Sequence, residues 1–121
     1  TAGTLAALAG AAFIGICAFL FIQAAAVATT GNLLLSDLPL IGVAAVAGLA
    51  GSLVDSVLGA TVQGIYWCAA CQKETERRIH TCGAATEPLR GWGWLNNDLV
   101  NLVSSVAGGL LAAGLGLVIL L

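Results

Sequence analysis

The sequence predicts an all-α, polytopic integral membrane protein with three transmembrane helices and one loop rich in cysteine and histidine. Of its 121 residues, 60% are hydrophobic and 8% are charged, which leaves too little polar material to cover a water-soluble domain. Three long apolar stretches each exceed the roughly 20 residues that a helix needs to cross a bilayer. The alternating pattern of a membrane β-barrel is missing from the sequence. We expect no nucleic-acid partner for such a chain.

The predicted spans cover residues of about 4–30, 38–67 and 97–121, with a loop over residues 68–96. We interpret residues 1–121 as a single transmembrane domain. The first span lacks a basic n-region and is too long for a signal-peptide core, so we expect it to be retained. The chain contains no methionine and begins without a polar flanking segment. We therefore expect it to be part of a longer protein, whose front half or other membrane subunits would be partners.

The four basic residues predict the orientation of the chain. All of them lie between the second and third spans: Lys73, Arg77, Arg78 and Arg90. By the positive-inside rule the 68–96 loop faces the cytoplasm, or the stroma or matrix of an organelle. Aromatic residues flank this loop at positions suited to a membrane interface: Tyr66, Trp67, Trp92 and Trp94.

The first span carries small residues that favour close helix packing, and we expect it to have a packing role. Its Cys17 lies too deep in the span to join the loop cysteines. Asp37 followed by Pro39 is typical of a helix N-terminus, with the proline in the first turn of the second span.

The second span combines a carboxylate with small residues on one helix face. Gly51, Asp55 and Gly59 recur at a spacing of four, and an adjacent row contains Gly48, Ser52 and Ser56. Such a face must meet another helix, a cavity or a ligand. A helix that continues to Tyr66 places Asp55 on the order of 16 Å from its inner end. Carboxylates within a membrane are functional by default, which makes Asp55 a candidate site residue.

The third span begins with a second polar stripe. Asn97, Asn101 and Ser105 recur at a spacing of four, with Asp98 and Ser104 one position round the helix. The two stripes can face each other and form one site of hard oxygen ligands, which suits Mg²⁺ with phosphate. The alternative is that the serines and amides serve only helix association, and that Asp98 stabilises a helix N-terminus.

The loop contains four metal-ligand residues within fifteen positions. Cys68, Cys71, His80 and Cys82 form a C-x2-C, H-x-C arrangement that can surround a tetrahedral Zn²⁺. Four protein ligands would make this zinc structural. A redox or disulfide pair and free thiols are the alternatives. We expect the KETERR run to be a solvated helical turn, and Arg90 to be the best phosphate contact among the basic residues.

Several spaced motifs resemble the transmembrane protein 19 family, whose plant members include phytyl-phosphate kinase. They are VDSVLGATVQ (54–63), the C-x2-C-x-K-x-TE run (68–76), H-x-CG (80–83), the RG at Arg90, and the Asn-rich start of the third span. The resemblance covers residues of about 1–110. Family members are about twice as long, with further motifs in a front half that has no counterpart here.

The resemblance implies a phosphotransferase that moves phosphate from a nucleoside triphosphate, preferably CTP, to an isoprenoid monophosphate. Asp55 and Ser56 match its Asp-Ser motif, and Asn97, Asp98 and Asn101 match its Asn-rich motif. In this hypothesis Asp55 and Asp98 bind Mg²⁺, and the amides and Ser56 contact the phosphates. Arg90 and Lys73 neutralise the charge that develops during transfer.

Two other functions remain open from the sequence. The chain could be a non-catalytic membrane subunit or lipid-binding partner, in which the polar stripes mediate helix association. It could also be a small ion or solute carrier that uses Asp55 as its ion site, although it lacks the repeated broken helices typical of many carriers.

Overall fold

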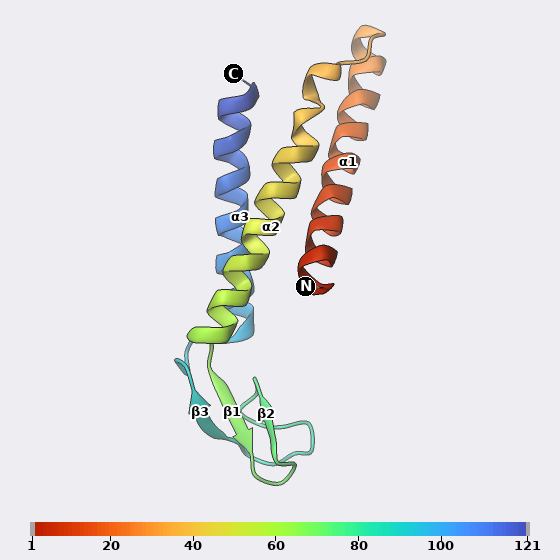
Figure 1. The fold of residues 1–121 in the computed structure, drawn as a ribbon. Coiled ribbons are helices and arrows are strands. Elements are labelled where there is room, and N and C mark those ends of the chain that lie inside the picture. The colour runs from red at the N-terminus through yellow and green to blue at the C-terminus, as the bar shows by residue number, and fades with distance from the viewer. Residues whose placement is uncertain (1, 121) are drawn as a thin grey trace. The chain divides into compact units, whose positions relative to one another are not determined.

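A computed structural model describes residues 2–120 of the chain (Figure 1). The elements follow in this order: α1 (Ala2–Thr30), the 3-10 helix η1 (Leu35–Asp37), α2 (Pro39–Thr61), β1 (Ile65–Cys68), β2 (Lys73–Thr75), β3 (Glu87–Arg90) and α3 (Asn97–Leu120). The described residues divide into two compact units, one of residues 2–53 with 105–120 and the other of residues 54–104. Helices α2 and α3 contribute residues to both units.

The helices confirm the three predicted spans. Within the described residues, three helical segments are long and apolar enough to cross a membrane: Ala2–Thr30, Leu35–Thr61 and Asn97–Ile119. Their large apolar side chains are mostly exposed, with Phe21 78% and Val118 80% accessible. Exposure on this scale is expected of helices whose outer faces contact lipid tails instead of water.

A glycine and a glutamine shape the turn between α1 and α2. Gly31 adopts a positive φ of 74° and its N–H donates to the Val27 carbonyl, which ends α1. The Gln23 amide donates to the Leu34 carbonyl at 2.7 Å and accepts from the Leu34 N–H at 2.8 Å. Gln23 is therefore present in an apolar span because it satisfies both backbone polar groups of a turn residue.

Small residues bring the helices of the first unit together, as the sequence predicts. A Cβ at Gly15 would lie 2.9 Å from the Cβ of Ala44, and one at Gly48 would overlap Ala11. On α3, a Cβ at Gly108 would lie 3.2 Å from the Ala47 carbonyl oxygen. These contacts require glycine because the backbones approach too closely for a larger side chain.

The second span is shorter than predicted, and its expected extension to Trp67 is wrong. Helix α2 ends at Thr61, where the Leu58 carbonyl accepts from the N–H groups of both Val62 and Gln63. The chain then continues as β1, whose sequence IYWC is rich in the aromatic and β-branched residues that favour strands. The shorter helix places the polar residues of α2 closer to its end.

A three-stranded antiparallel sheet occupies much of the loop for which the sequence predicted only a Cys/His cluster. The strand order is β2-β1-β3, with Tyr66 paired with Thr75 on one side and with Pro88 on the other. The helical turn expected over KETERR is wrong, because Lys73–Thr75 form β2 instead. Ile65, Tyr66 and Cys68 of β1 are buried, whereas β3 is exposed along its length.

Two backbone hydrogen bonds join the ends of the loop, and we call this arrangement the clasp. The Trp92 N–H donates to the Val62 carbonyl and the Gly64 N–H donates to the Leu95 carbonyl, each at 2.9 Å. Gly91 adopts a positive φ of 75°, and a Cβ there would overlap the Gln63 carbonyl. Glycine at 91 is therefore needed both for its backbone conformation and for the close approach of the two segments.

Candidate functional site

The sheet brings together four metal-ligand side chains that are spread over fifteen positions of the sequence. Cys68 ends β1, and Cys71 lies in the turn to β2, where Gln72 has a positive φ of 51°. His80 and Cys82 lie in a second turn, which is closed by the bridge between Ile79 and Ala85. The Gly83 N–H donates to the His80 carbonyl at 2.9 Å within that turn. Two backbone turns therefore present the four side chains to one another.

The ligand atoms of these residues form a compact cluster. One atom from each of Cys68, Cys71, His80 and Cys82 lies within 4.8 Å of the other three. The sulfurs of Cys68 and Cys82 are 3.8 Å apart, and His80 Nδ1 is 3.1 Å from the Cys82 sulfur. With Zn–S bonds of about 2.3 Å, the sulfurs of a tetrahedral zinc site lie about 3.8 Å apart. The separation of Cys68 and Cys82 thus matches such a site.

The cysteines of the cluster differ in acidity. The pKa of Cys82 is lowered to about 6 by a hydrogen bond from the backbone of Ala84, and further by His80 and Cys71. The pKa of Cys71 is raised to about 11 by its hydrogen bond with Cys82, by desolvation and by Cys68. One thiolate therefore forms readily at neutral pH, while its neighbour keeps its proton.

The predicted ligand set therefore meets in space, and the cluster could bind a metal such as zinc. The structure contains no disulfide among the described residues, in which all four cysteines are free. Cys17 lies in α1, in the other unit, as the sequence predicts.

Asp55 is hydrogen bonded to the helix that follows the sheet. The hydroxyl of Ser104 on α3 lies 3.4 Å from Asp55 Oδ1 and 3.0 Å from the Asn101 carbonyl oxygen, and its single proton is shared between these two acceptors. Ser104 is 6% exposed, and Asp55 is half-buried. This contact joins the two polar stripes that the sequence places on the second and third spans.

Asp55 also lies at a shallower position than the sequence predicted. It is six residues from the end of α2 at Thr61, which is about 9 Å along the axis at 1.5 Å per residue instead of the expected 16 Å. A carboxylate near a helix end costs less than one at the bilayer centre, because water and headgroups can reach it.

The other predicted residues of α3 are exposed at its start: Asn97, Asp98 and Asn101. Asn96 caps this helix, because its side-chain oxygen accepts from the Leu99 N–H at 2.9 Å. Asp98 is six residues before Ser104, so it lies about 120° round the helix from the residue that contacts Asp55. Asn97 and Asn101 lie closer to the face of Ser104. Joint binding of Mg²⁺ by Asp55 and Asp98 stays a prediction.

Two arginines of the loop donate hydrogen bonds that the sequence did not predict. Arg90 donates to the Ala60 carbonyl at 3.0 Å and so stabilises the end of α2. Arg78 donates to the Tyr66 hydroxyl at 3.3 Å and to the Gly93 carbonyl at 3.1 Å. Ser56 and Lys73 are exposed.

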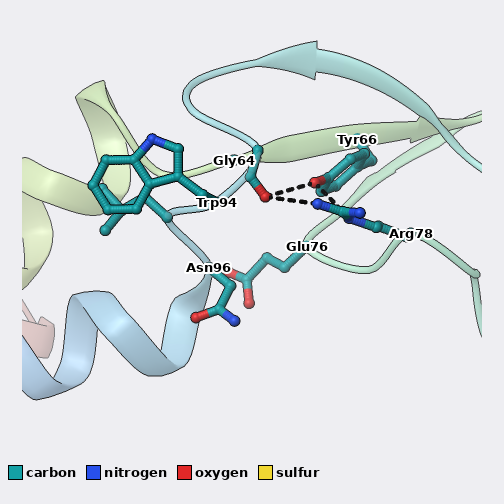
Figure 2. A pocket seen from close by; sticks show the side chains of 8 residues that line it. Gly64, Tyr66, Glu76, Arg78, Trp94 and Asn96 are labelled. Carbon is teal, nitrogen blue, oxygen red and sulfur yellow. Dashed lines mark hydrogen bonds between the residues drawn. The ribbon is translucent and has the colours of Figure 1, made fainter.

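Arg78 lines a pocket that the sequence did not reveal (Figure 2). The cavity measures about 350 Å³, and Tyr66, Glu76, Trp94 and Asn96 also line it. Figure 2 shows the guanidinium of Arg78 beside the Tyr66 hydroxyl, with Glu76 and Asn96 also lining the pocket. Residue spacing alone does not reveal this position of Arg78, because it depends on the pairing of β1 with β2.

Three membrane-length helices and a small sheet that gathers thiols and an imidazole define an integral membrane protein with an extramembrane metal-ligand cluster. A family model described as "Integral membrane protein DUF92" matches residues 1–109. The chain belongs to this family of integral membrane proteins.

A curated relative extends the comparison. The chain is 36% identical over 103 residues to "Protein PGR" of Arabidopsis thaliana, an alignment that covers 85% of this chain and 34% of the relative. The chain thus spans about a third of the length of that relative. No solved structure matches the chain. The narrower resemblance to the transmembrane protein 19 family and to phytyl-phosphate kinase stays a prediction.

Proposed function

We propose that this chain forms part of a membrane phosphotransferase that transfers phosphate from a nucleoside triphosphate, preferably CTP, to an isoprenoid monophosphate. The observation that supports the proposal most is Asp55, a carboxylate on α2 that Ser104 holds near the end of the helix. An isoprenoid tail would lie between apolar helices, while its phosphate would reach the polar residues at the helix ends. The reaction needs charge neutralisation and positioning more than covalent chemistry.

In this proposal Asp55 and Asp98 bind Mg²⁺, while Asn97 and Asn101 orient the metal and the phosphates. Helix geometry favours the two amides as partners of Asp55, because they lie closer to the face of Ser104 than Asp98 does. Ser56 follows Asp55 directly and would donate to a phosphate oxygen.

The cations of the loop would neutralise the transferred phosphoryl group. Lys73 is exposed on β2 and can move toward a phosphate. Arg90 contacts only the Ala60 carbonyl among its described hydrogen bonds, which leaves other N–H groups of its guanidinium for a phosphate. Arg78 joins this set, because its guanidinium lines the pocket beside Glu76 and Asn96.

The test is transfer of label from γ-³²P-CTP to phytyl or geranylgeranyl monophosphate by the longest native form of the protein in lipid nanodiscs. Asp55→Asn should reduce transfer by about 100-fold or more, because it removes a charge used in the transition state. Asp37→Asn is the matched control, since the same change falls in η1, in the other unit. It should leave transfer unchanged.

Two outcomes would contradict the proposal. A folded Asp55→Asn variant that keeps full activity would assign Asp55 to helix packing alone. A folded native form that transfers no label from CTP, ATP or GTP would favour the non-catalytic membrane subunit.

A further inference from the structure

We propose that Cys68, Cys71, His80 and Cys82 bind one structural zinc ion, and that this ion fixes the segment that carries Arg78 into its pocket. Three thiolates and an imidazole are borderline-soft donors that favour zinc in tetrahedral geometry, whereas Mg²⁺ and Ca²⁺ require oxygen donors. The proposal does not depend on the phosphotransferase function.

The geometry of the cluster is close to that of a filled site. The sulfurs of Cys68 and Cys82 already stand at the edge length of a zinc tetrahedron, and the four ligand atoms need small shifts to reach bonding distance. His80 presents Nδ1 to the cluster, at 3.1 Å from the Cys82 sulfur. Four protein ligands leave no open position for water or substrate, so the ion is structural and not catalytic.

A disulfide is the alternative to zinc, but it would involve only two of the four side chains. The sulfurs of Cys68 and Cys82 are 3.8 Å apart, well beyond the bonded distance of about 2.05 Å. Any disulfide would also leave one thiol and the imidazole of His80 without a covalent role. A single metal ion accounts for all four side chains.

Few buried apolar side chains stabilise the outer part of the loop. The buried apolar side chains of the sheet belong to β1, namely Ile65, Tyr66 and Cys68, whereas β2 and β3 are largely exposed. Small regions with such limited cores commonly depend on a metal or disulfide. A zinc ion would join the end of β1 to the 80–82 turn, which no neighbouring strand covers in the described sheet.

This junction is directly connected to Arg78, which precedes His80 by two residues. The Arg78 carbonyl accepts from the Thr86 N–H at 3.0 Å, so the backbone at Arg78 belongs to the turn that presents His80 and Cys82. Its guanidinium reaches Tyr66 and Gly93 on the other side. The metal therefore anchors one end of a short segment, and these hydrogen bonds anchor the other.

The first experiment measures metal and thiols in the longest native form, purified in detergent without chelators. We expect about one zinc per chain, together with cysteines that alkylate only after the metal is removed. Cobalt substitution should give the intense visible absorption of tetrahedral thiolate coordination. Cys82→Ser should abolish zinc binding; Cys82 is exposed, so the change does not disturb the apolar core. The matched control Cys17→Ser should keep the metal.

The second experiment tests the link to Arg78 by hydrogen exchange with and without chelation of the metal. The amide of Thr86 should exchange at least 10-fold faster after zinc removal, while the amides of α1 should not change. Zinc below about 0.2 per chain in the native form, or a disulfide within the cluster by mass spectrometry, would overturn the site. Stoichiometric zinc with unchanged exchange at Thr86 would overturn the link to Arg78.

Discussion

The two compact units of the chain are stabilised in different ways. In the unit of residues 2–53 and 105–120, most side chains are apolar and exposed, and glycines such as Gly15 and Gly48 let the helix backbones approach closely. In the unit of residues 54–104, the sheet depends on specific polar contacts, a glycine at a positive φ and a cluster of metal ligands. The first unit therefore depends on close packing of apolar helices, whereas the second depends on hydrogen bonds and on the metal-ligand side chains.

The largest effect is expected at the clasp. Gly91→Ala should destabilise the loop by on the order of 3 kcal/mol, because it adds a strained positive φ to an overlap with the Gln63 carbonyl. Gly83→Ala is the matched control, since Gly83 also has a positive φ but its added Cβ meets nothing within 4 Å. Hydrogen exchange at the Trp92 and Gly64 amides measures the difference. Equal exchange in the two variants would show that the clasp is not tight.

A smaller effect is expected where α1 and α2 meet. Gly48→Leu should cost about 1–3 kcal/mol, because the side chain would have to displace Ala11. Gly42→Leu places the same side chain on α2 where nothing lies within 4 Å, and it should have little effect. Thermal unfolding of α-helix in detergent, followed by circular dichroism, compares them. A stable Gly48→Leu variant would contradict the close packing of these helices.

The smallest effect is expected at Ser104. Ser104→Ala removes a hydrogen bond of 3.4 Å to Asp55, and interhelical hydrogen bonds in membranes contribute about 0.6 kcal/mol on average. Stability should therefore change by less than about 1 kcal/mol. The exposed neighbour Ser105→Ala provides the control in the same unfolding measurement. A loss of several kcal/mol at Ser104 would mean that Asp55 depends on this hydroxyl far more than its geometry suggests.

The transmembrane spans and the metal ligands could be predicted from the sequence, whereas the strands could not. Hydropathy identified all three spans, because a bilayer imposes length and apolar composition on every helix that crosses it. Spacing also identified the four metal ligands, since their residue types are specific. The strands β1, β2 and β3 were not predicted. The IYWC stretch of β1 continues an apolar run, and strands this short cannot be distinguished from their surroundings by periodicity.

The contact between Asp55 and Ser104 could be predicted from the sequence, whereas the pocket around Arg78 could not. Helical periodicity placed Asp55 and Ser104 on adjoining stripes, and the structure joins them. The pocket around Arg78 depends on strand pairing and on Gly93, which is fifteen positions away in sequence. The residue pattern within one short segment does not show which distant segment it will contact.

The clasp makes the segment between its two ends a separable insertion. The chain leaves α2 and approaches α3 at the same place, with Val62 bonded to Trp92 and Gly64 bonded to Leu95. Residues 65–90 are thus an insertion whose two ends are already neighbours, a condition under which segments can be lengthened, exchanged or removed without moving their supports. A short glycine-rich turn in place of this segment should therefore leave the transmembrane helices able to insert and pair, although it would remove the metal-ligand cluster.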